Sequence, residues 1–143
     1  MADPPAARRD RPHRVFLDAN VLFSAAYRPD ARLRRLWTLP HAPALVSSPY
    51  AAAEARRNLE PGAWDRLDAL LEAVEIVPDV LQGELPGGVR LPEKDRPILL
   101  TALAADATHL LTGDWKHFGP HFGLAAGLRI EPPGEYIARE HRT

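Results

Sequence analysis

Residues 14–27 have the sequence RVFLDANVLFSAAY, a short apolar run followed by an aspartate and then by helix-forming residues. The run at residues 14–17 predicts a buried strand, because a short block of bulky apolar residues suits a strand that is covered on both faces. Residues 20–27 predict a helix that ends before Pro29, since proline disfavours a helical conformation in the residue preceding it. A strand that passes directly into a helix indicates a chain of alternating α/β type.

The rest of the chain repeats this alternation of strands and helices. Further strands are predicted at residues 44–47, 75–77, 109–112 and 128–130. Further helices are predicted at residues 31–39, 48–59, 64–74, 95–105 and 133–139, with a short helical turn at 115–118. Asp30 is expected to cap the first of these helices, and Ser48 followed by Pro49 the second. Because strands alternate with helices, we expect an α/β fold with a parallel sheet covered on both faces.

Length and composition favour a single domain without cysteine. The 143 residues fit one domain, which we place at residues 14–143, behind a flexible tail rich in proline and arginine at residues 1–13. Residues 78–92 hold three prolines and three glycines, so we predict a partly mobile surface loop there. The absence of cysteine excludes disulfides, zinc–thiolate sites and thiol nucleophiles.

The sequence contains neither a membrane segment nor a secretion signal that we can identify. No apolar stretch reaches the roughly 20 residues that a membrane-spanning helix needs, and the N-terminal residues lack an apolar signal core. We therefore expect a cytoplasmic protein. The net charge of −1 is not that of a basic nucleic-acid-binding module, although arginines cluster at residues 8–14, 32–35 and 56–57.

Acidic residues stand at four positions that suggest a shared site. Asp18 and Asp114 each follow a predicted strand, Asp95 begins a helix, and Glu54 lies in an alanine-rich helix. If the two strands are parallel neighbours, Asp18 and Asp114 share the carboxyl edge of the sheet, where ligands bind in open α/β folds. Carboxylates gathered there would repel one another unless a divalent cation lay between them, and oxygen ligands suit Mg²⁺ or Mn²⁺. This pattern favours metal-dependent hydrolysis of phosphodiesters.

Each acid also has an ordinary structural explanation. Asp18 could cap the following helix, although Asn20 would serve equally well. Asp114 could cap the turn that follows it, and Asp95 suits the N-terminus of a helix. Glu54 could be a solvated helix residue. Four acids spread over one alternating chain are nevertheless hard to explain as independent caps, so the metal site remains the leading hypothesis.

Two histidines and a tryptophan lie close to Asp114 in the sequence. His117 and His121 could contact phosphate or bind metal, but surface or loop histidines are the favoured interpretation. Trp115 could stack on a nucleic-acid base, although an aromatic side chain that anchors the turn is favoured.

Four sequence motifs resemble those of PIN-domain ribonucleases, and they occur in the same order. They are FLDANVL at residues 16–22, the segment 48–59 that carries Glu54, KDRPIL at residues 94–99 and HLLTGD at residues 109–114. The similarity extends over residues 14–140, nearly the whole chain. One departure is Thr108, where many members of the family carry an aspartate and where the nearby acid is Asp106.

This resemblance implies a three-layer α/β/α domain with a central parallel sheet and a Mg²⁺- or Mn²⁺-dependent endoribonuclease activity. It assigns the catalytic acids as Asp18, Glu54, Asp95 and Asp114, supported by Asn20 and Thr112. Asp18, Asp95 and Asp114 would bind the metal or its water ligands, and Glu54 would orient or deprotonate the attacking water. The resemblance leaves two roles open, a VapC-like toxin or a stand-alone RNA-processing enzyme, and RNA is the expected substrate of both. Many such toxins work with a cognate antitoxin that blocks the acidic pocket, often as homodimers, so an antitoxin and a second copy of the chain are the partners that the toxin role implies.

Two other classes of function stay open. The chain could be a non-catalytic RNA-binding or scaffold protein with the same fold, although four intact acids argue against it. It could also be a haloacid-dehalogenase-type phosphatase or a phosphoacceptor receiver domain. The phosphatase needs a second aspartate where this chain has Asn20, and the receiver needs a late lysine, for which Lys94 and Lys116 are poorly placed.

Overall fold

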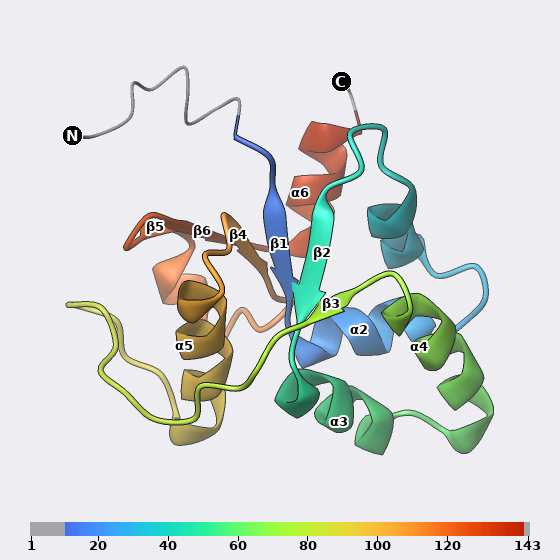
Figure 1. The fold of residues 1–143 in the computed structure, drawn as a ribbon, viewed down its shortest axis with the longest axis horizontal. Coiled ribbons are helices and arrows are strands. Elements are labelled where there is room, and N and C mark those ends of the chain that lie inside the picture. Colours follow the sequence, from blue (N-terminus) through green and yellow to red (C-terminus); the bar gives the residue numbers. More distant parts are fainter. Residues whose placement is uncertain (1–10, 142–143) are drawn as a thin grey trace.

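The computed structural model describes residues 11–141, which fold around one six-stranded sheet of order β3-β2-β1-β4-β6-β5 (Figure 1). The strands are β1 (Arg14–Leu17), β2 (Ala44–Ser47), β3 (Glu75–Ile76), β4 (His109–Leu111), β5 (Gly123–Ala125) and β6 (Leu128–Glu131). Neighbouring strands are parallel, except that β5 is antiparallel to β6. The predicted α/β fold with a central parallel sheet is confirmed, with the antiparallel strand β5 as an addition at one edge.

Helices cover both faces of this sheet. The α-helices are α2 (Ala19–Ala26), α3 (Pro49–Asn58), α4 (Trp64–Leu71), α5 (Arg96–Ala104) and α6 (Pro133–Glu140). Within residues 11–141 the 3-10 helices are η1 (Arg32–Thr38), η2 (Pro61–Ala63), η3 (Glu93–Asp95) and η4 (Gly119–His121). In Figure 1, α5 lies in front of the sheet whereas α2 and α6 lie behind it, an arrangement consistent with the three layers of an α/β/α fold.

The central strands form the core because they are covered on both faces. Phe16 of β1 and Leu110 of β4 are direct neighbours in the sheet, and neither is exposed to solvent. Leu99 of α5 and Tyr136 of α6 are also fully buried. Removing one such side chain from water contributes about 1.5–3 kcal/mol to folding. This core fixes the positions of both ends of β1 and β4.

The helix predicted at residues 31–39 is found as the 3-10 helix η1, one residue shorter at each end. Asp30 does not cap it, since no side chain makes a capping hydrogen bond at its start. Leu33, Leu36 and Leu39 follow one another at intervals of three residues, and all three pack against the core. This interval matches the three residues per turn of a 3-10 helix. Burial of these leucines therefore explains the tighter helix.

The edge strand β5 has no counterpart among the predicted strands. It forms a hairpin with β6 through a two-residue turn at Ala126 and Gly127, whose φ angles are 51° and 81°. Two positive φ angles are what a type I′ hairpin turn requires. Asparagine, aspartate or glycine usually fills the first of these positions, so the alanine concealed the hairpin in the sequence.

Other elements differ from the predictions mainly in length. Helix α4 ends at Leu71 rather than at residue 74, and α5 begins at Arg96 after the short helix η3. The predicted helical turn at residues 115–118 is a hydrogen-bonded turn rather than a helix, and η4 follows it. Helix α3 begins as predicted, because the side chain of Ser48 accepts a hydrogen bond from the backbone N–H of Ala51.

Residues 78–92 contain no helix or strand, as predicted. They are attached to α5 by two hydrogen bonds. The backbone N–H of Val80 donates to Thr101 Oγ1 at 2.8 Å, and Arg96 Nη2 donates to the carbonyl oxygen of Gly83 at 2.8 Å. This long connection is therefore held against the helix that follows Asp95.

The first described residues already belong to the folded domain. Most of the tail predicted at residues 1–13 lies outside the described residues. His13 is described, and its Nδ1 atom lies 2.7 Å from the hydroxyl of the buried Tyr136. The folded domain therefore includes His13, one residue before the predicted boundary.

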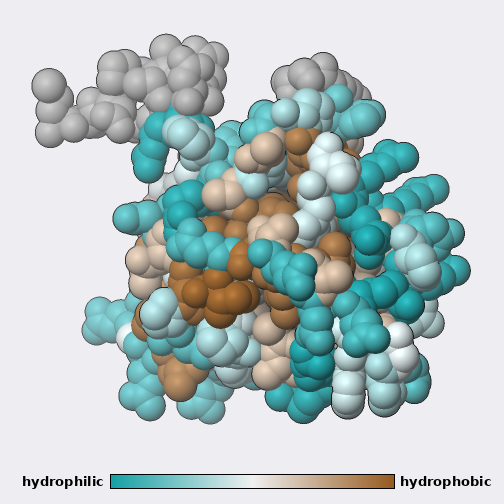
Figure 2. Space-filling model, turned by 45° about the vertical axis from the view of Figure 1, so that its right-hand side comes forward, coloured by the Kyte–Doolittle hydropathy of each residue, from teal (hydrophilic) through white to brown (hydrophobic). Residues whose placement is uncertain are grey.

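The surface is mixed in polarity. Figure 2 shows hydrophilic residues over most of the face that is turned to the viewer, around a central apolar area. The large apolar side chains with the greatest exposure in residues 11–141 are those of Leu124 in β5, Trp115 and Leu81. None of the helices in residues 11–141 is long and apolar enough to cross a membrane.

Candidate metal centre

The four acids singled out in the sequence line one cavity beyond the carboxyl ends of β1 and β4. This cavity has a volume of about 330 Å³, and Asp18, Glu54, Asp95 and Asp114 all contribute to its wall. Ala19, Asn20, Phe23, Asn58 and Lys94 complete the lining. The prediction that these four distant acids converge is confirmed.

Asp18 is fixed in place by the pairing of β1 with β4. Leu17 lies opposite Leu111, and the backbone N–H of Asp18 donates to the carbonyl oxygen of Leu111 at 3.1 Å. Thr112 directly follows β4, and its hydroxyl donates a hydrogen bond to Asp18 Oδ2 at 2.8 Å. Asp18 Oδ1 accepts from the backbone N–H of Ala19 at 2.7 Å. Asp18 therefore caps α2 and faces the cavity at once, so its two sequence interpretations are compatible.

Asn20 joins the start of α2 to the segment after β4. Its Nδ2 atom lies 3.3 Å from both Asp18 Oδ2 and Thr112 Oγ1, and its Oδ1 accepts from the backbone N–H of Gly113 at 2.7 Å. A Cβ atom at position 113 would lie 3.3 Å from that Oδ1, which explains why glycine suits this close approach. Asn20 and Thr112 thus contact Asp18, as expected of residues that hold it in one orientation.

Asp95 and Asp114 meet at the imidazole of His117. Asp114 Oδ1 accepts from the backbone N–H of His117 at 3.0 Å, and Asp114 Oδ2 lies 2.8 Å from His117 Nδ1. The same Nδ1 atom lies 3.2 Å from Asp95 Oδ2. The single hydrogen of His117 Nδ1 is taken by Asp114. Asp95 Oδ2 is therefore the buried side-chain polar atom that has no hydrogen-bond partner within the described residues. Such an unsatisfied buried oxygen calls for an explanation, and a bound ion is one.

The surroundings of the two histidines differ. His117 lies in a turn, as predicted, but its side chain is only 24% exposed and it contacts two of the four acids. The nearness of Asp114 in the sequence was the available signal for this contact. His121 is instead the half-buried last residue of η4; its Nε2 lies 3.0 Å from the carbonyl oxygen of Arg90, and it does not line the acidic cavity.

Glu54 reaches the cavity from helix α3. Asn58 lines the same cavity, four residues later and therefore on the same face of the helix. The hydroxyl of Tyr50 donates to the carbonyl oxygen of Lys94 at 2.6 Å, and this bond ties α3 to the segment that carries Asp95. Glu54 has no hydrogen bond or ion pair with another side chain among residues 11–141. Asn58 was missed in the sequence, although its spacing from Glu54 would have indicated it.

The three aspartates of the cavity carry perturbed pKa values. Burial, and then the charges of Asp95 and Glu54, raise the pKa of Asp18 to about 6 despite its two hydrogen bonds. Burial and the charge of Asp114 also raise the pKa of Asp95. Burial acts to raise the pKa of Asp114 as well, but the hydrogen bonds from His117 outweigh it and leave that pKa below its ordinary value. The cavity therefore concentrates negative charge that is only partly compensated.

The residues present fit a hard divalent cation. The ligand atoms of Asp95, Asp114 and His117 all lie within 4.8 Å of one another. Asp18 Oδ1 accepts one hydrogen bond, so it keeps a lone pair for a cation or its water ligand. Carboxylate oxygens are the donors that Mg²⁺ and Mn²⁺ prefer. Lys94 is the one cationic residue in the cavity lining, against four carboxylates.

A comparison with known proteins adds no family assignment. No model of a known protein family matches the chain, and no curated protein matches it. The motif resemblance noted in the sequence therefore stays a prediction, and the argument for function depends on the geometry of the site.

Proposed function

We propose that this protein is a Mg²⁺- or Mn²⁺-dependent endoribonuclease of the PIN-domain type. One observation carries the proposal: Asp18, Glu54, Asp95 and Asp114, which are far apart in the sequence, line a single cavity at the carboxyl edge of a parallel sheet. This edge is where open α/β folds bind their ligands. The order of the four motifs in the sequence supports the same activity.

Each acid has a distinct task in the proposed reaction. When bound, a divalent cation would supply Lewis acidity at the phosphate and lower the pKa of a water ligand. Asp95, Asp114 and Asp18 would hold it, and Thr112 keeps Asp18 in its orientation. Glu54 has no side-chain partner among residues 11–141, so its carboxylate can orient the attacking water and accept its proton.

A groove next to the acids favours single-stranded RNA as the substrate. Phe23 lines both the acidic cavity and a neighbouring cavity of about 320 Å³, whose lining includes Tyr27, Arg28 and Arg32. Tyr27 is 54% exposed, and the guanidinium carbon of Arg28 lies 5.8 Å from the centre of its ring. Exposed aromatic rings stack on bases and arginines pair with phosphates in proteins that bind single strands. This groove would lead the strand to the acids.

The partners of the proposed enzyme follow from the same cavity. An antitoxin would inhibit it most directly by placing a basic side chain among the four acids, and homodimer formation remains a second proposal. A cytoplasmic location suits an enzyme that acts on RNA. The coding sequence next to that of this protein tests the toxin proposal, because we expect it to encode a small DNA-binding antitoxin.

Cleavage of a panel of single-stranded RNAs tests the activity. We expect cleavage that requires Mg²⁺ or Mn²⁺ and that Asp18→Asn and Asp114→Asn each abolish. Asp65→Asn is the matched control, because Asp65 is exposed on α4, away from the cavity, and should leave cleavage unchanged. Circular dichroism of each variant establishes that the fold is retained.

The outcome also separates this activity from the main alternative. Metal-independent binding of RNA without cleavage by any metal-loaded sample would favour a non-catalytic RNA-binding protein. Cleavage that persists in both site variants would contradict the proposed role of the cavity.

A further inference from the structure

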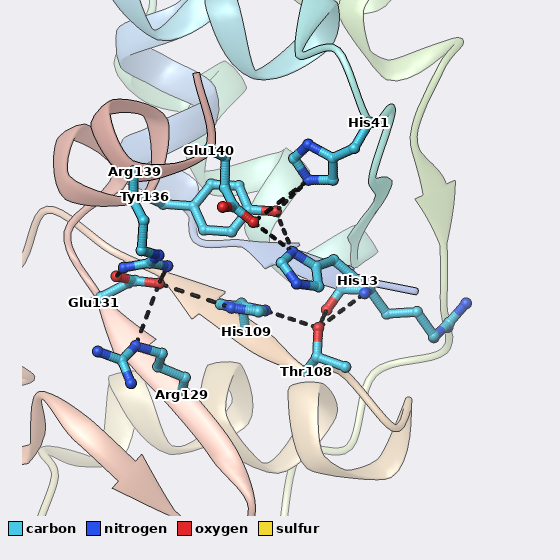
Figure 3. Close-up of polar contacts among 10 residues, drawn as sticks. His13, His41, Thr108, His109, Arg129, Glu131, Tyr136, Arg139 and Glu140 are labelled. Carbon is cyan, nitrogen blue, oxygen red and sulfur yellow. Dashed lines mark hydrogen bonds and ion pairs between the residues drawn. The ribbon is translucent and has the colours of Figure 1, made fainter. Parts of the chain in front are cut away.

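A second cluster of side chains that can bind a metal lies at the amino ends of the parallel strands, which we call the amino edge of the sheet, opposite the carboxyl edge that holds the acidic cavity. His13 directly precedes β1, and His41 lies in the connection before β2. Helix α6 brings Tyr136 and Glu140 to the same place (Figure 3). Because β1 lies between His13 and Asp18, this cluster is separated from the acidic cavity by the length of the strand.

The three ligating atoms lie close to the spacing that a tetrahedral ion requires. His13 Nδ1 lies 3.3 Å from Glu140 Oε1, and His41 Nε2 lies 3.7 Å from the same oxygen. All three atoms lie within 4.8 Å of one another. Two ligands that each lie about 2.0–2.1 Å from a tetrahedral ion are separated by roughly 3.3–3.5 Å. Small side-chain rotations therefore suffice to bring the three atoms around one ion.

We propose that His13, His41 and Glu140 form a binding site for a divalent transition-metal ion, with Zn²⁺ as the best fit. Two imidazoles and one carboxylate make up a common ligand set of three-ligand zinc sites. Mg²⁺ fits poorly, since it prefers oxygen ligands in an octahedral arrangement. The site therefore differs in metal preference from the acidic cavity at the other edge.

Tyr136 directs the two imidazoles toward one place, and an ion bound there would replace its hydrogen bonds to the two ring nitrogens. Its hydroxyl lies 2.7 Å from His13 Nδ1 and 3.2 Å from His41 Nε2, so both nitrogens point to one place. Tyr136 is itself fully buried, which fixes the position of its hydroxyl between the two rings.

Glu140 is the anionic residue among the three proposed ligands, and a second carboxylate, Glu131, lies nearby. Glu131 is paired with Arg139, whose two Nη atoms lie 2.8 and 2.7 Å from the two oxygens of Glu131. Arg129 Nε lies 3.8 Å from Glu131 as well. Glu131 thus forms ion pairs with both arginines in this region (Figure 3).

Space for a fourth ligand lies beside the cluster. A cavity of about 890 Å³ is lined by His13 and Glu140, together with Arg11, Thr108, His109, Leu124, Gly127, Arg129 and Arg139. A three-ligand zinc site keeps its fourth position for water or another small ligand. A bound ion would also connect the start of β1, the connection before β2 and helix α6, which are far apart in the sequence.

Zinc titration of the full chain tests this proposal. Calorimetry is carried out on the Asp95→Asn/Asp114→Asn double variant, which removes two of the four carboxylates of the acidic cavity and so weakens it as a competing site. We expect one Zn²⁺ per chain in this background. Adding His41→Ala should weaken binding at least about 100-fold, since losing a mere hydrogen-bond partner of a metal ligand already costs about 10–100-fold. His121→Ala is the matched control and should leave the affinity unchanged.

Two further measurements keep the result decisive. Co²⁺ should give the visible absorption of a tetrahedral site in this background, and neither His41→Ala nor His13→Gln should show it. His41 is exposed, so its substitution should leave the circular dichroism spectrum unchanged. Equal zinc affinity with and without His41→Ala, or an equal loss with His121→Ala, would overturn the proposal and leave the cluster as a hydrogen-bond network around Tyr136.

Discussion

The carboxyl edge and the amino edge of the parallel sheet present different sets of possible metal ligands, although the same strands build both. At its carboxyl edge, β1 delivers Asp18 to a cavity lined by four carboxylates. At its amino edge, the same strand begins after His13, which meets a second imidazole and one carboxylate. Hard oxygen donors select Mg²⁺ or Mn²⁺, whereas imidazoles select Zn²⁺ and its neighbours. One sheet can therefore hold two cation sites that differ in selectivity.

Burial acts on both edges in the same physical direction, toward the uncharged form. It raises the pKa of Asp18 to about 6 at the carboxyl edge. At the amino edge burial, helped by the charges of His13 and Arg139, lowers the pKa of His109 to about 3. A nearby cation would therefore stabilise the ionised form of Asp18, whereas His109 is held in its neutral form.

The largest expected effect is on RNA cleavage, and it distinguishes a residue that binds the metal, Asp95, from one that acts on the attacking water, Glu54. Asp95→Asn should lower RNA cleavage at least about 100-fold and weaken Mn²⁺ binding, because it removes a proposed ligand. Glu54→Gln should lower cleavage to a comparable extent while Mn²⁺ binding persists, because Glu54 is proposed to act on water. Single-turnover cleavage and Mn²⁺ calorimetry on both variants measure the difference. Equal loss of Mn²⁺ affinity in the two variants would make Glu54 a ligand instead.

The next effect concerns acid stability at the amino edge. The folded pKa of His109 is about 3 and its ordinary value is 6.5, so the unfolded chain takes up the proton first as pH falls. The contribution of neutral His109 to the free energy of unfolding is fully present above pH 6.5 and is lost progressively at lower pH. Between pH 7 and pH 5 the loss is about 2 kcal/mol.

Urea unfolding of wild type and His109→Gln at the two pH values checks this effect. The variant should be less stable at pH 7, since it disturbs a buried site, but its stability should fall less on acidification. Parallel loss of stability in both proteins would show that other groups cause the acid sensitivity.

The smallest effect is the pH dependence of metal binding at the carboxyl edge. The pKa of Asp18 lies near 6 without metal, and a cation needs the ionised carboxylate. Mn²⁺ affinity should therefore fall as pH drops through 6, by about tenfold at pH 5 from this group alone. Calorimetric Mn²⁺ titrations from pH 7.5 to pH 5 measure it. An affinity that stays constant over this range would place Asp18 outside the cation site.

Much of the fold was predictable because the signals are local. Strands β1 and β2 are found at the predicted residues, since short apolar runs between turn residues specify buried strands. Ser48 and Pro49 marked the start of α3 for a similar local reason. Strand β5 escaped prediction because its turn places Ala126 at a positive φ angle that alanine rarely adopts.

The carboxyl-edge site was largely predictable, and the amino-edge cluster was not. Parallel neighbours bring the residues after their strands to one edge, so Asp18 and Asp114 were expected together. His13, His41 and Glu140 follow no spacing rule, because a connection and the last helix bring them together only after the sheet has formed.

The sequence by itself determined the alternation of strands and helices and the acids that end up at the carboxyl edge, because apolar runs and chain direction are local properties. Tertiary structure decided that Asp95 keeps an unsatisfied oxygen, that Asp18 titrates near pH 6 and that two distant histidines share Glu140. These properties depend on burial and on distances between atoms of remote segments, and packing alone sets both.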